Sequence, residues 1–334
     1  MCDFRRGKPE IPLAVKIGIA DDLLQIARFF YYVNESSETR GTMNAKPFCI
    51  FLGAFLVLTI FAHKALSRLL APAMPENPQR IVSLAPNLTE TLYALGLGPR
   101  VVGVTDFCAF PPEVRDKPRV AGFSSINFEA LLRAQPDLVV LPFDKAGSWQ
   151  HLERLGLATL SLDTRSLPGL MEAIAVLGRA AGRDGEARSI LEGITQGLTA
   201  AEERARGKER PRVLFSIMHS YQGPGNITEI VAVGDDGFFD AMIRAAGGRN
   251  AYEGILSFPR LSRESLLFLN PDVIIDVIPA GENPEAARRD WNSLYSISAI
   301  KNQRLILLTD EAHTVPGPRL VHTLAKLSQA FHPE

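Results

Sequence analysis

The sequence has few cysteines and no excess of charge of either sign. Only three cysteines, Cys2, Cys49 and Cys108, occur in 334 residues, which are too few and too scattered for a disulfide framework or a thiolate metal cluster. Lys and Arg total 36 against 37 for Asp and Glu, and a net charge of −1 gives no field that attracts nucleic acid or an anionic membrane. These absences exclude a small disulfide-bonded scaffold and a DNA-binding protein.

Long apolar runs are also scarce. Residues 48–62, FCIFLGAFLVLTIFA, form a stretch without charge. A helix that spans a bilayer needs about 20 apolar residues, whereas the apolar region of a signal peptide has roughly 7–15. A single run of this length rules out a multi-span membrane protein and indicates export of the rest of the chain.

The start of the chain leaves alternatives open. Because Met43 and Lys46 stand just before the apolar run, we expect Met43, in place of Met1, to be the true start. Residues 1–42 are then a poorly ordered upstream extension. Residues 43–73 are either a signal peptide cleaved after Ala73 or a retained membrane anchor, and a buried helix of a soluble protein is the third alternative.

From residue 80 onward, short apolar runs alternate with helical stretches. A composition of 46% hydrophobic and 22% charged residues is that of a folded globular protein, and the length suggests two domains. We expect strands at 80–84, 101–104, 138–141 and 159–162, which predicts a parallel sheet covered on both faces. Asn87 is expected to cap the first helix, with Glu90 three residues after it.

A long helix is expected near the middle of the chain. Residues 167–181 and 186–206 have helical periodicity, and a second strand–helix series begins at residue 212. The predicted fold class is α/β, with two similar lobes that each hold a mainly parallel sheet and are joined by one long α-helix. The expected boundaries are 80–166 for the N-terminal lobe, 167–207 for the helical connection and 211–332 for the C-terminal lobe.

One motif occurs in both halves. Glu129 stands seven residues before Pro136-Asp137, as Glu264 stands seven before Pro271-Asp272, and an apolar run follows each Pro-Asp. Asn127 and Ser262 are expected to cap the two helices, which would place both glutamates in a first turn. Two such carboxylates suit two basic sites on a symmetric partner. The alternative is that each simply stabilises a helix N-terminus, by about 0.3–1 kcal/mol.

No catalytic motif is present in the sequence. It lacks a Gly-x-Ser-x-Gly elbow, a phosphate-binding glycine loop and a His-Glu-x-x-His pair, and we find no set of residues for a metal site. His219 and His313 follow predicted strands, where ligands of α/β folds bind. Either could contact a ligand, or be an ordinary loop histidine.

Aromatic residues gather after the predicted strands. They are Phe107, Phe110, Phe123 and Phe143 in the first lobe and Phe258 in the second. Side chains at one edge of both lobes would suit a broad, flat, apolar ligand. Anchoring of the loops to the core is the alternative.

Residues 80–330 resemble the periplasmic substrate-binding proteins of ABC importers for cobalamin, ferric siderophores and haem. The opening RIVSLAPNLTETLYALG at 80–96 is close to the first motif of that family, and GPRL at 317–320 also fits. The segment VGVTDFCAFPP at 102–112 is most similar to the cobalamin-binding branch. The resemblance implies a monomeric, non-enzymatic periplasmic protein with no cofactor. It would pass a corrinoid such as vitamin B12 to a permease dimer in the inner membrane, free or anchored by the helix at 48–62.

The resemblance also implies roles for particular residues. Glu129 and Glu264 would dock onto the permease. An aromatic cluster would grip the corrin through Phe107, Phe123, Phe143 and Phe258, although the last three are often tryptophan in that branch. Haem would favour His219, Tyr221 or His313 as axial ligand, and a siderophore would favour Arg260 and Arg319. An enzyme such as a metal chelatase on a similar fold is a further alternative.

Overall fold

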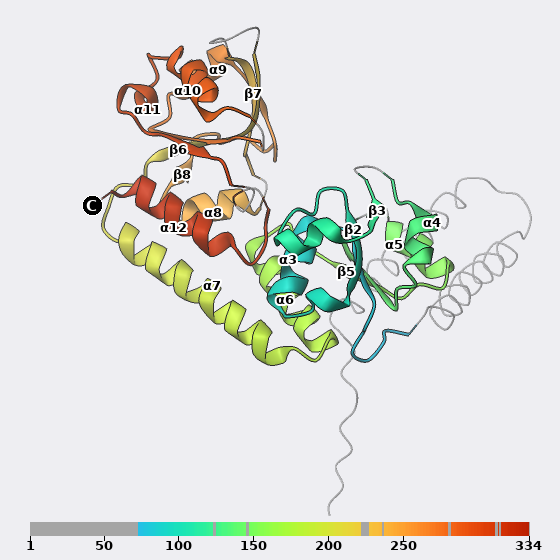
Figure 1. The fold of residues 1–334 in the computed structure, drawn as a ribbon. Helices are drawn as coiled ribbons and strands as arrows, with labels where there is room; N and C mark the ends of the chain where they lie inside the picture. The colour runs from blue at the N-terminus through green and yellow to red at the C-terminus, as the bar shows by residue number, and fades with distance from the viewer. Residues whose placement is uncertain are drawn as a thin grey trace, which may run out of the picture. The chain divides into compact units, whose positions relative to one another are not determined.

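The computed structural model (Figure 1) describes residues 73–333, apart from 123–124, 145–146, 222–226, 236, 280–281, 311–312 and 314. The chain divides into two compact units, Met1–Leu70 and Ala71–Glu334, and the described residues belong to the second. The expectations about residues 1–42, the start at Met43 and the apolar run lie outside the described residues. Within the described part of the chain, no helix is long and apolar enough to cross a membrane.

The N-terminal lobe is built on a five-stranded parallel sheet with strand order β3-β2-β1-β4-β5. Its strands are β1 (Ile81–Ser83), β2 (Val101–Thr105), β3 (Arg119–Ala121), β4 (Leu138–Pro142) and β5 (Thr159–Leu162). Helices α3 (Pro86–Ala94), α4 (Phe128–Arg133) and α5 (Ser148–Arg154) connect them, with 3-10 turns at Gly98–Arg100 and Pro112–Asp116. The four predicted strands are confirmed, and β3 was not anticipated.

The C-terminal lobe has a mixed sheet. Its strands are β6 (Arg212–Tyr221), β7 (Ile227–Ala232), β8 (Arg249–Asn250), β9 (Arg260–Ser262), β10 (Val273–Val277) and β11 (Leu305–Leu308), in the order β11-β10-β6-β7-β9 with β8 beside β6. The pairs β6–β7 and β7–β9 are antiparallel, and the others are parallel. The connection from β6 to β7 is short enough for a hairpin and too short for the crossover that a parallel pair needs.

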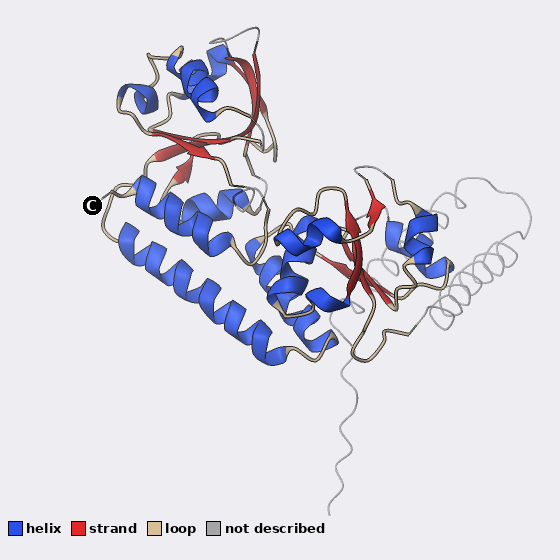
Figure 2. Cartoon of the chain, viewed as in Figure 1, coloured by secondary structure: helices blue, strands red, loops and turns tan. Residues whose placement is uncertain are grey.

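Helices α8 (Phe239–Ala245), α9 (Arg263–Leu269), α10 (Pro284–Asn292), α11 (Ser298–Lys301) and α12 (Leu320–Phe331) complete the second lobe. Helices α6 (Leu167–Ala180) and α7 (Asp184–Ala205) connect the lobes, and α7 lies beside α12 (Figure 1). Figure 2 shows the strands gathered in two sheets with helices around them. The predicted fold of two α/β lobes and a long joining helix is confirmed.

One buried apolar cluster extends through both lobes and the helices between them. Its members include Leu92 of α3, Ile174 of α6, Ile194 of α7, Phe215 of β6 and Leu324 of α12. The lobes therefore share a core and are not two separately packed domains.

The repeated Pro-Asp motif has the same structural role in each lobe. Asp137 accepts hydrogen bonds from the backbone N–H groups of Gln79 (2.7 Å) and Arg80 (3.0 Å) at the start of β1. Asp272 accepts one from the N–H of Arg212 (2.8 Å) at the start of β6. Each aspartate thus joins the first strand of its lobe to the neighbouring parallel strand, as expected of a structural repeat.

The predicted cap of the first helix is wrong. The N-cap is Ala85, because Pro86 fits the first helical position and begins the helix earlier than expected. Asn87 lies inside α3, where its Nδ2 donates to the Thr164 hydroxyl at 2.8 Å. The Glu90 carboxylate is therefore not part of a capping box.

Both motif aspartates should contribute to stability. Replacing Asp137 or Asp272 by Ala leaves strand-end N–H groups without their acceptor, so we expect each change to lower the free energy of unfolding by about 1–2 kcal/mol. Because the lobes share a core, each variant should still unfold in one transition. Denaturant titration followed by circular dichroism measures both effects. Asp116→Ala at an exposed position is the control, and a loss confined to one aspartate would contradict the shared structural role.

Candidate functional site

Two phenylalanines lie beyond the carboxyl ends of the N-terminal strands. Phe107 follows β2 and Phe143 follows β4, and their side chains are 55% and 41% exposed. The Phe143 N–H donates to the carbonyl of Leu162 at 2.8 Å. Because all strands of this sheet run in the same direction, both rings lie at its carboxyl edge, where ligands of α/β folds bind.

An ion pair stands beside Phe143. The Arg165 guanidinium lies 5.2 Å from the centre of the Phe143 ring and donates to both oxygens of Asp163, at 2.9 and 2.6 Å. These side-chain hydrogen bonds hold the pKa of Asp163 below its usual value. The charge at this part of the edge is therefore neutralised within the protein.

The C-terminal lobe presents an apolar loop between β8 and β9. Phe258 is 50% exposed, and Ile255 and Leu256 before it are exposed as well. The loop lies close against Gly234, where a Cβ would stand 2.0 Å from the Leu256 carbonyl oxygen, so only glycine permits this approach. Met218 of β6 is also exposed. Adjacent exposed apolar side chains make this loop a candidate binding surface. The apolar pair before Ser257 was the signal that sequence reasoning missed.

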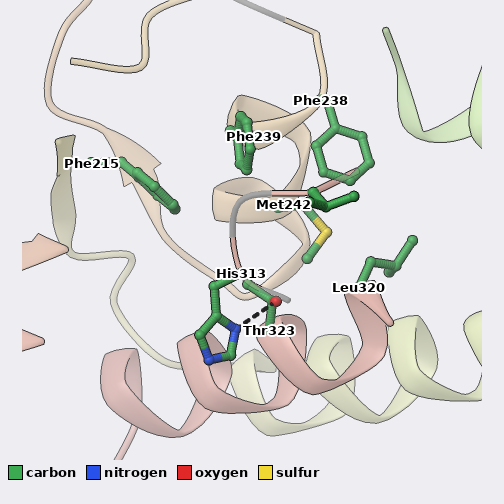
Figure 3. Close-up of a pocket in the computed structure, with 8 residues that line it drawn as sticks. Phe215, Phe238, Phe239, Met242, His313, Leu320 and Thr323 are labelled. Atoms are coloured by element: carbon green, nitrogen blue, oxygen red, sulfur yellow. Dashed lines mark hydrogen bonds between the residues drawn. The ribbon is translucent and has the colours of Figure 1, made fainter. Parts of the chain in front are cut away.

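His313 lies in the interior and not on a ligand-accessible surface. Its ring is buried, and Nδ1 is 2.8 Å from the Thr323 hydroxyl (Figure 3). The adjoining cavity is lined by Phe215, Phe238, Phe239, Met242, His313, Val315, Leu320 and Thr323. Its free volume is about 10 Å³, which is room for about one water molecule and far too little for a haem or a corrin.

Both arginines considered for an anionic ligand are ion-paired. Arg319 donates to Glu90 through Nε (2.9 Å) and Nη2 (2.6 Å), and its guanidinium lies 3.6 Å from the centre of the Phe110 ring. Arg260 donates to Glu229 at 2.7 Å. The side chain of Arg319 is largely buried in its pair, whereas that of Arg260 is 70% exposed and uses Nη1 on Glu229.

The repeated glutamates occupy equivalent positions. Asn127 and Ser262 accept hydrogen bonds from the N–H groups of Ala130 and Ser265, so both predicted caps are confirmed. Glu129 and Glu264 are each the second residue of a helix, and both are exposed.

Their local partners differ. Glu129 forms an ion pair with Arg133 one turn later. The Ser262 hydroxyl donates to Glu264 at 2.7 Å, and this bond, helped by the backbone N–H of Glu264 itself, lowers the pKa of that carboxyl.

Three predicted residues remain predictions. Phe123 lies outside the described residues, as do the side chains of His219 and Tyr221. In the part of the chain that is described, no group of three or more His, Cys, Asp or Glu side chains could hold a metal ion.

A family model described as periplasmic binding protein matches residues 81–312. The chain belongs to the periplasmic binding protein family. It is 27% identical over 264 residues to an uncharacterised ABC transporter substrate-binding lipoprotein of Bacillus subtilis, covering 78% of this chain and 82% of that protein. It is 26% identical over 274 residues to a cobalamin-binding protein of Halobacterium salinarum, covering 78% and 72%.

A solved structure is also similar. The apo form of a periplasmic haem-binding protein from Roseiflexus sp. RS-1 has a TM-score of 0.63 and 27% identity, covering 76% of this chain and 98% of that one. The resemblance stated from the sequence is thereby confirmed at the level of the family.

The burial of His313 predicts a pH dependence of stability. Burial lowers the pKa of His313 from 6.5, as it lowers the pKa of His332. The unfolded chain therefore binds a proton at each of these histidines more readily than the folded protein does. The free energy of unfolding is highest above about pH 6.5 and falls as the pH decreases below that value. His313→Asn keeps a hydrogen-bonding group near Thr323 without a titrating ring, and we expect a shallower loss of melting temperature between pH 7 and pH 5.

The matched variant is His332→Gln, which can retain the contact of Nε2 with the Gly247 carbonyl. The two substitutions should flatten the profile additively, because both rings act through the same linkage. An unchanged profile in the double variant would show that these histidines do not govern stability in this pH range.

Proposed function

We propose that this protein is the substrate-binding component of an ABC importer and that it captures a corrinoid such as cobalamin between its two lobes. The observation that carries the proposal is the set of half-exposed rings of Phe107, Phe143 and Phe258 in loops of both lobes. The similarity to the cobalamin-binding protein of Halobacterium salinarum supports the same ligand class.

The physical basis of capture is apolar contact with a broad ring system. Burying one phenylalanine side chain against a ligand contributes about 1.5–3 kcal/mol, so three rings supply affinity without any charged group. Phenylalanine offers no N–H donor, so these three rings would hold the ligand by shape and contact area alone. The periplasm is the proposed location, whether the N-terminal segment is cleaved or retained.

The charged side chains near this edge argue for a neutral ligand and against catalysis. Asp163 pairs with Arg165, and Glu90 pairs with Arg319, so these groups are committed to one another. A ferric siderophore would need cationic contacts, and the most buried arginine near this edge, Arg319, is bound to Glu90, which leaves the exposed Arg260 as the cationic candidate.

Haem is the second candidate ligand. The relative from Roseiflexus, which is described as haem-binding, favours it. His313 is buried against Thr323, which leaves His219 and Tyr221 as the candidates for axial ligand.

The phenylalanines should control affinity. Phe107→Ala or Phe258→Ala removes one apolar contact, and we expect binding to weaken about tenfold or more. The full-length protein is titrated with cyanocobalamin, haem or a ferric siderophore to measure affinity. Chromatography then shows which ligand's absorbance co-elutes with the protein. Phe268→Ala is the matched control. Phe268 is an exposed phenylalanine near the carboxyl end of α9 and is not one of the proposed ligand contacts.

Cyanocobalamin should bind, and the control should bind it like the wild type. Wild-type binding of haem alone would replace the corrinoid proposal by the second candidate. Unchanged affinity in both phenylalanine variants, with the fold intact, would remove these rings from the site.

The proposed partner is a two-fold symmetric permease that Glu129 and Glu264 contact together. Exposed ion pairs are individually weak, about 0.2–1 kcal/mol, but pairs desolvated in an interface are worth more. Reversal of both glutamates to Lys should abolish uptake and leave ligand affinity unchanged, and either single reversal should give a partial defect.

Ligand uptake by vesicles that carry the importer measures the transport defect. A parallel titration of each variant measures its ligand affinity. Glu202→Lys on the exposed face of α7 is the control for added positive charge. Normal uptake by the double variant would assign both glutamates to helix capping alone. Loss of ligand binding would instead place them in the site.

A further inference from the structure

A buried ion pair joins the two lobes. Arg319 immediately precedes α12 in the C-terminal lobe, and Glu90 lies on α3 in the N-terminal lobe. Their side chains are only 17% and 5% exposed. This contact links positions 229 residues apart in the sequence.

The geometry of the pair is restrictive. Arg319 uses two donors, Nε and Nη2, on the two oxygens of Glu90, at 2.9 and 2.6 Å. Its guanidinium also covers the Phe110 ring at 3.6 Å. A Cβ at Gly317 would stand 3.2 Å from Oε2 of Glu90, so the chain before α12 approaches the carboxylate closely. A planar guanidinium that donates to two carboxylate oxygens and also stacks on a ring can adopt only one arrangement.

Such a pair is poorly explained by stability alone. Removing two charges from water costs about as much as their attraction returns, so a buried pair adds little to folding on balance. What it can supply is a unique arrangement of the elements that it joins. Here those elements belong to the two lobes that carry Phe107 and Phe258 in exposed loops.

We infer that Arg319 is a positioning residue that forms an inter-lobe clamp with Glu90 and fixes the angle between the lobes. The clamp sets the spacing of the apolar loops on the two sides and does not itself contact the ligand. Its consequence for binding rests on the proposed function, whereas its effect on the lobe angle does not. The continuous core and helix α7 limit large movements, and the clamp determines the remaining few degrees.

Distances between spin labels test the clamp in the full-length protein. Labels on Leu155→Cys and Tyr295→Cys report on the two lobes, since both positions are exposed. Cys2 and Cys49 are changed to serine, and Cys108 is buried. In the ligand-free protein we expect a narrow distance distribution.

The variants separate the clamp from general destabilisation. Arg319→Gln and Glu90→Gln each leave one buried charge without its partner and could unfold the protein. The double variant Glu90→Gln/Arg319→Gln removes both charges and should remain folded. It should give a broadened label distance and at least tenfold weaker cyanocobalamin binding. Arg319→Lys keeps the charge and loses the fork, so its distribution should be intermediate. Arg260→Gln, which breaks an ion pair within the C-terminal lobe, is the control and should stay narrow.

The outcomes are distinct. A narrow distribution in the folded double variant would overturn the clamp. An unchanged distribution with lost affinity would also overturn it, because Arg319 would then act by touching the ligand. A broadened distribution in a protein whose wild type binds none of the three ligands would uphold the clamp and reject the proposed function.

Discussion

The arrangement of this protein depends on the burial of apolar side chains in one core that continues through both lobes. A chain with two self-contained cores could move its lobes independently, since only a linker would join them. Here α6, α7 and α12 each contribute side chains to the same cluster as the strands β1 and β6. The position of each lobe is therefore restrained by packing and not only by the chain. Capture of a ligand between such lobes requires a site that is largely formed before the ligand arrives.

The parallel strands explain why apolar loops gather where they do. In a parallel sheet the loops that follow the strands all emerge at one edge, so Phe107 and Phe143 lie at the same edge although their positions are 36 apart in the sequence. In the second lobe β6, β9 and β10 also run in one direction. The carboxyl edge of the N-terminal sheet thus carries Phe107 and Phe143, whereas Phe258 lies in the loop just before β9, at the amino end of that strand.

Sequence reasoning succeeded where local chemistry decides the structure. The caps Asn127 and Ser262 hydrogen-bond within three residues, and the apolar strands need only their own composition to be recognised. It failed at α3, where a proline at the first position outweighed the capping preference of Asn87.

Contacts between elements far apart in the sequence were not predicted. The hairpin of β6 and β7 was also not predicted, although its short connection at 222–226, QGPGN, carries a strong turn signal. The pairing of Glu90 with Arg319 joins residues from opposite ends of the fold. No local pattern distinguishes an arginine that will be buried against a carboxylate from one that will meet a ligand.

The two glutamates show how a structural repeat can diverge in its chemistry. Arg133 follows Glu129 by one helical turn and pairs with it, whereas Phe268 occupies the corresponding position after Glu264. In the proposed docking, a basic partner would exchange an existing ion pair at α4, whereas at α9 it would meet a carboxylate held by a serine hydroxyl beside an exposed ring. The exchange at α4 costs little, because an exposed pair of this kind is worth about 0.2–1 kcal/mol. Two lobes of the same fold thus carry equivalent charges in unequal surroundings, and the glutamate of the C-terminal lobe has the more apolar exposed neighbour.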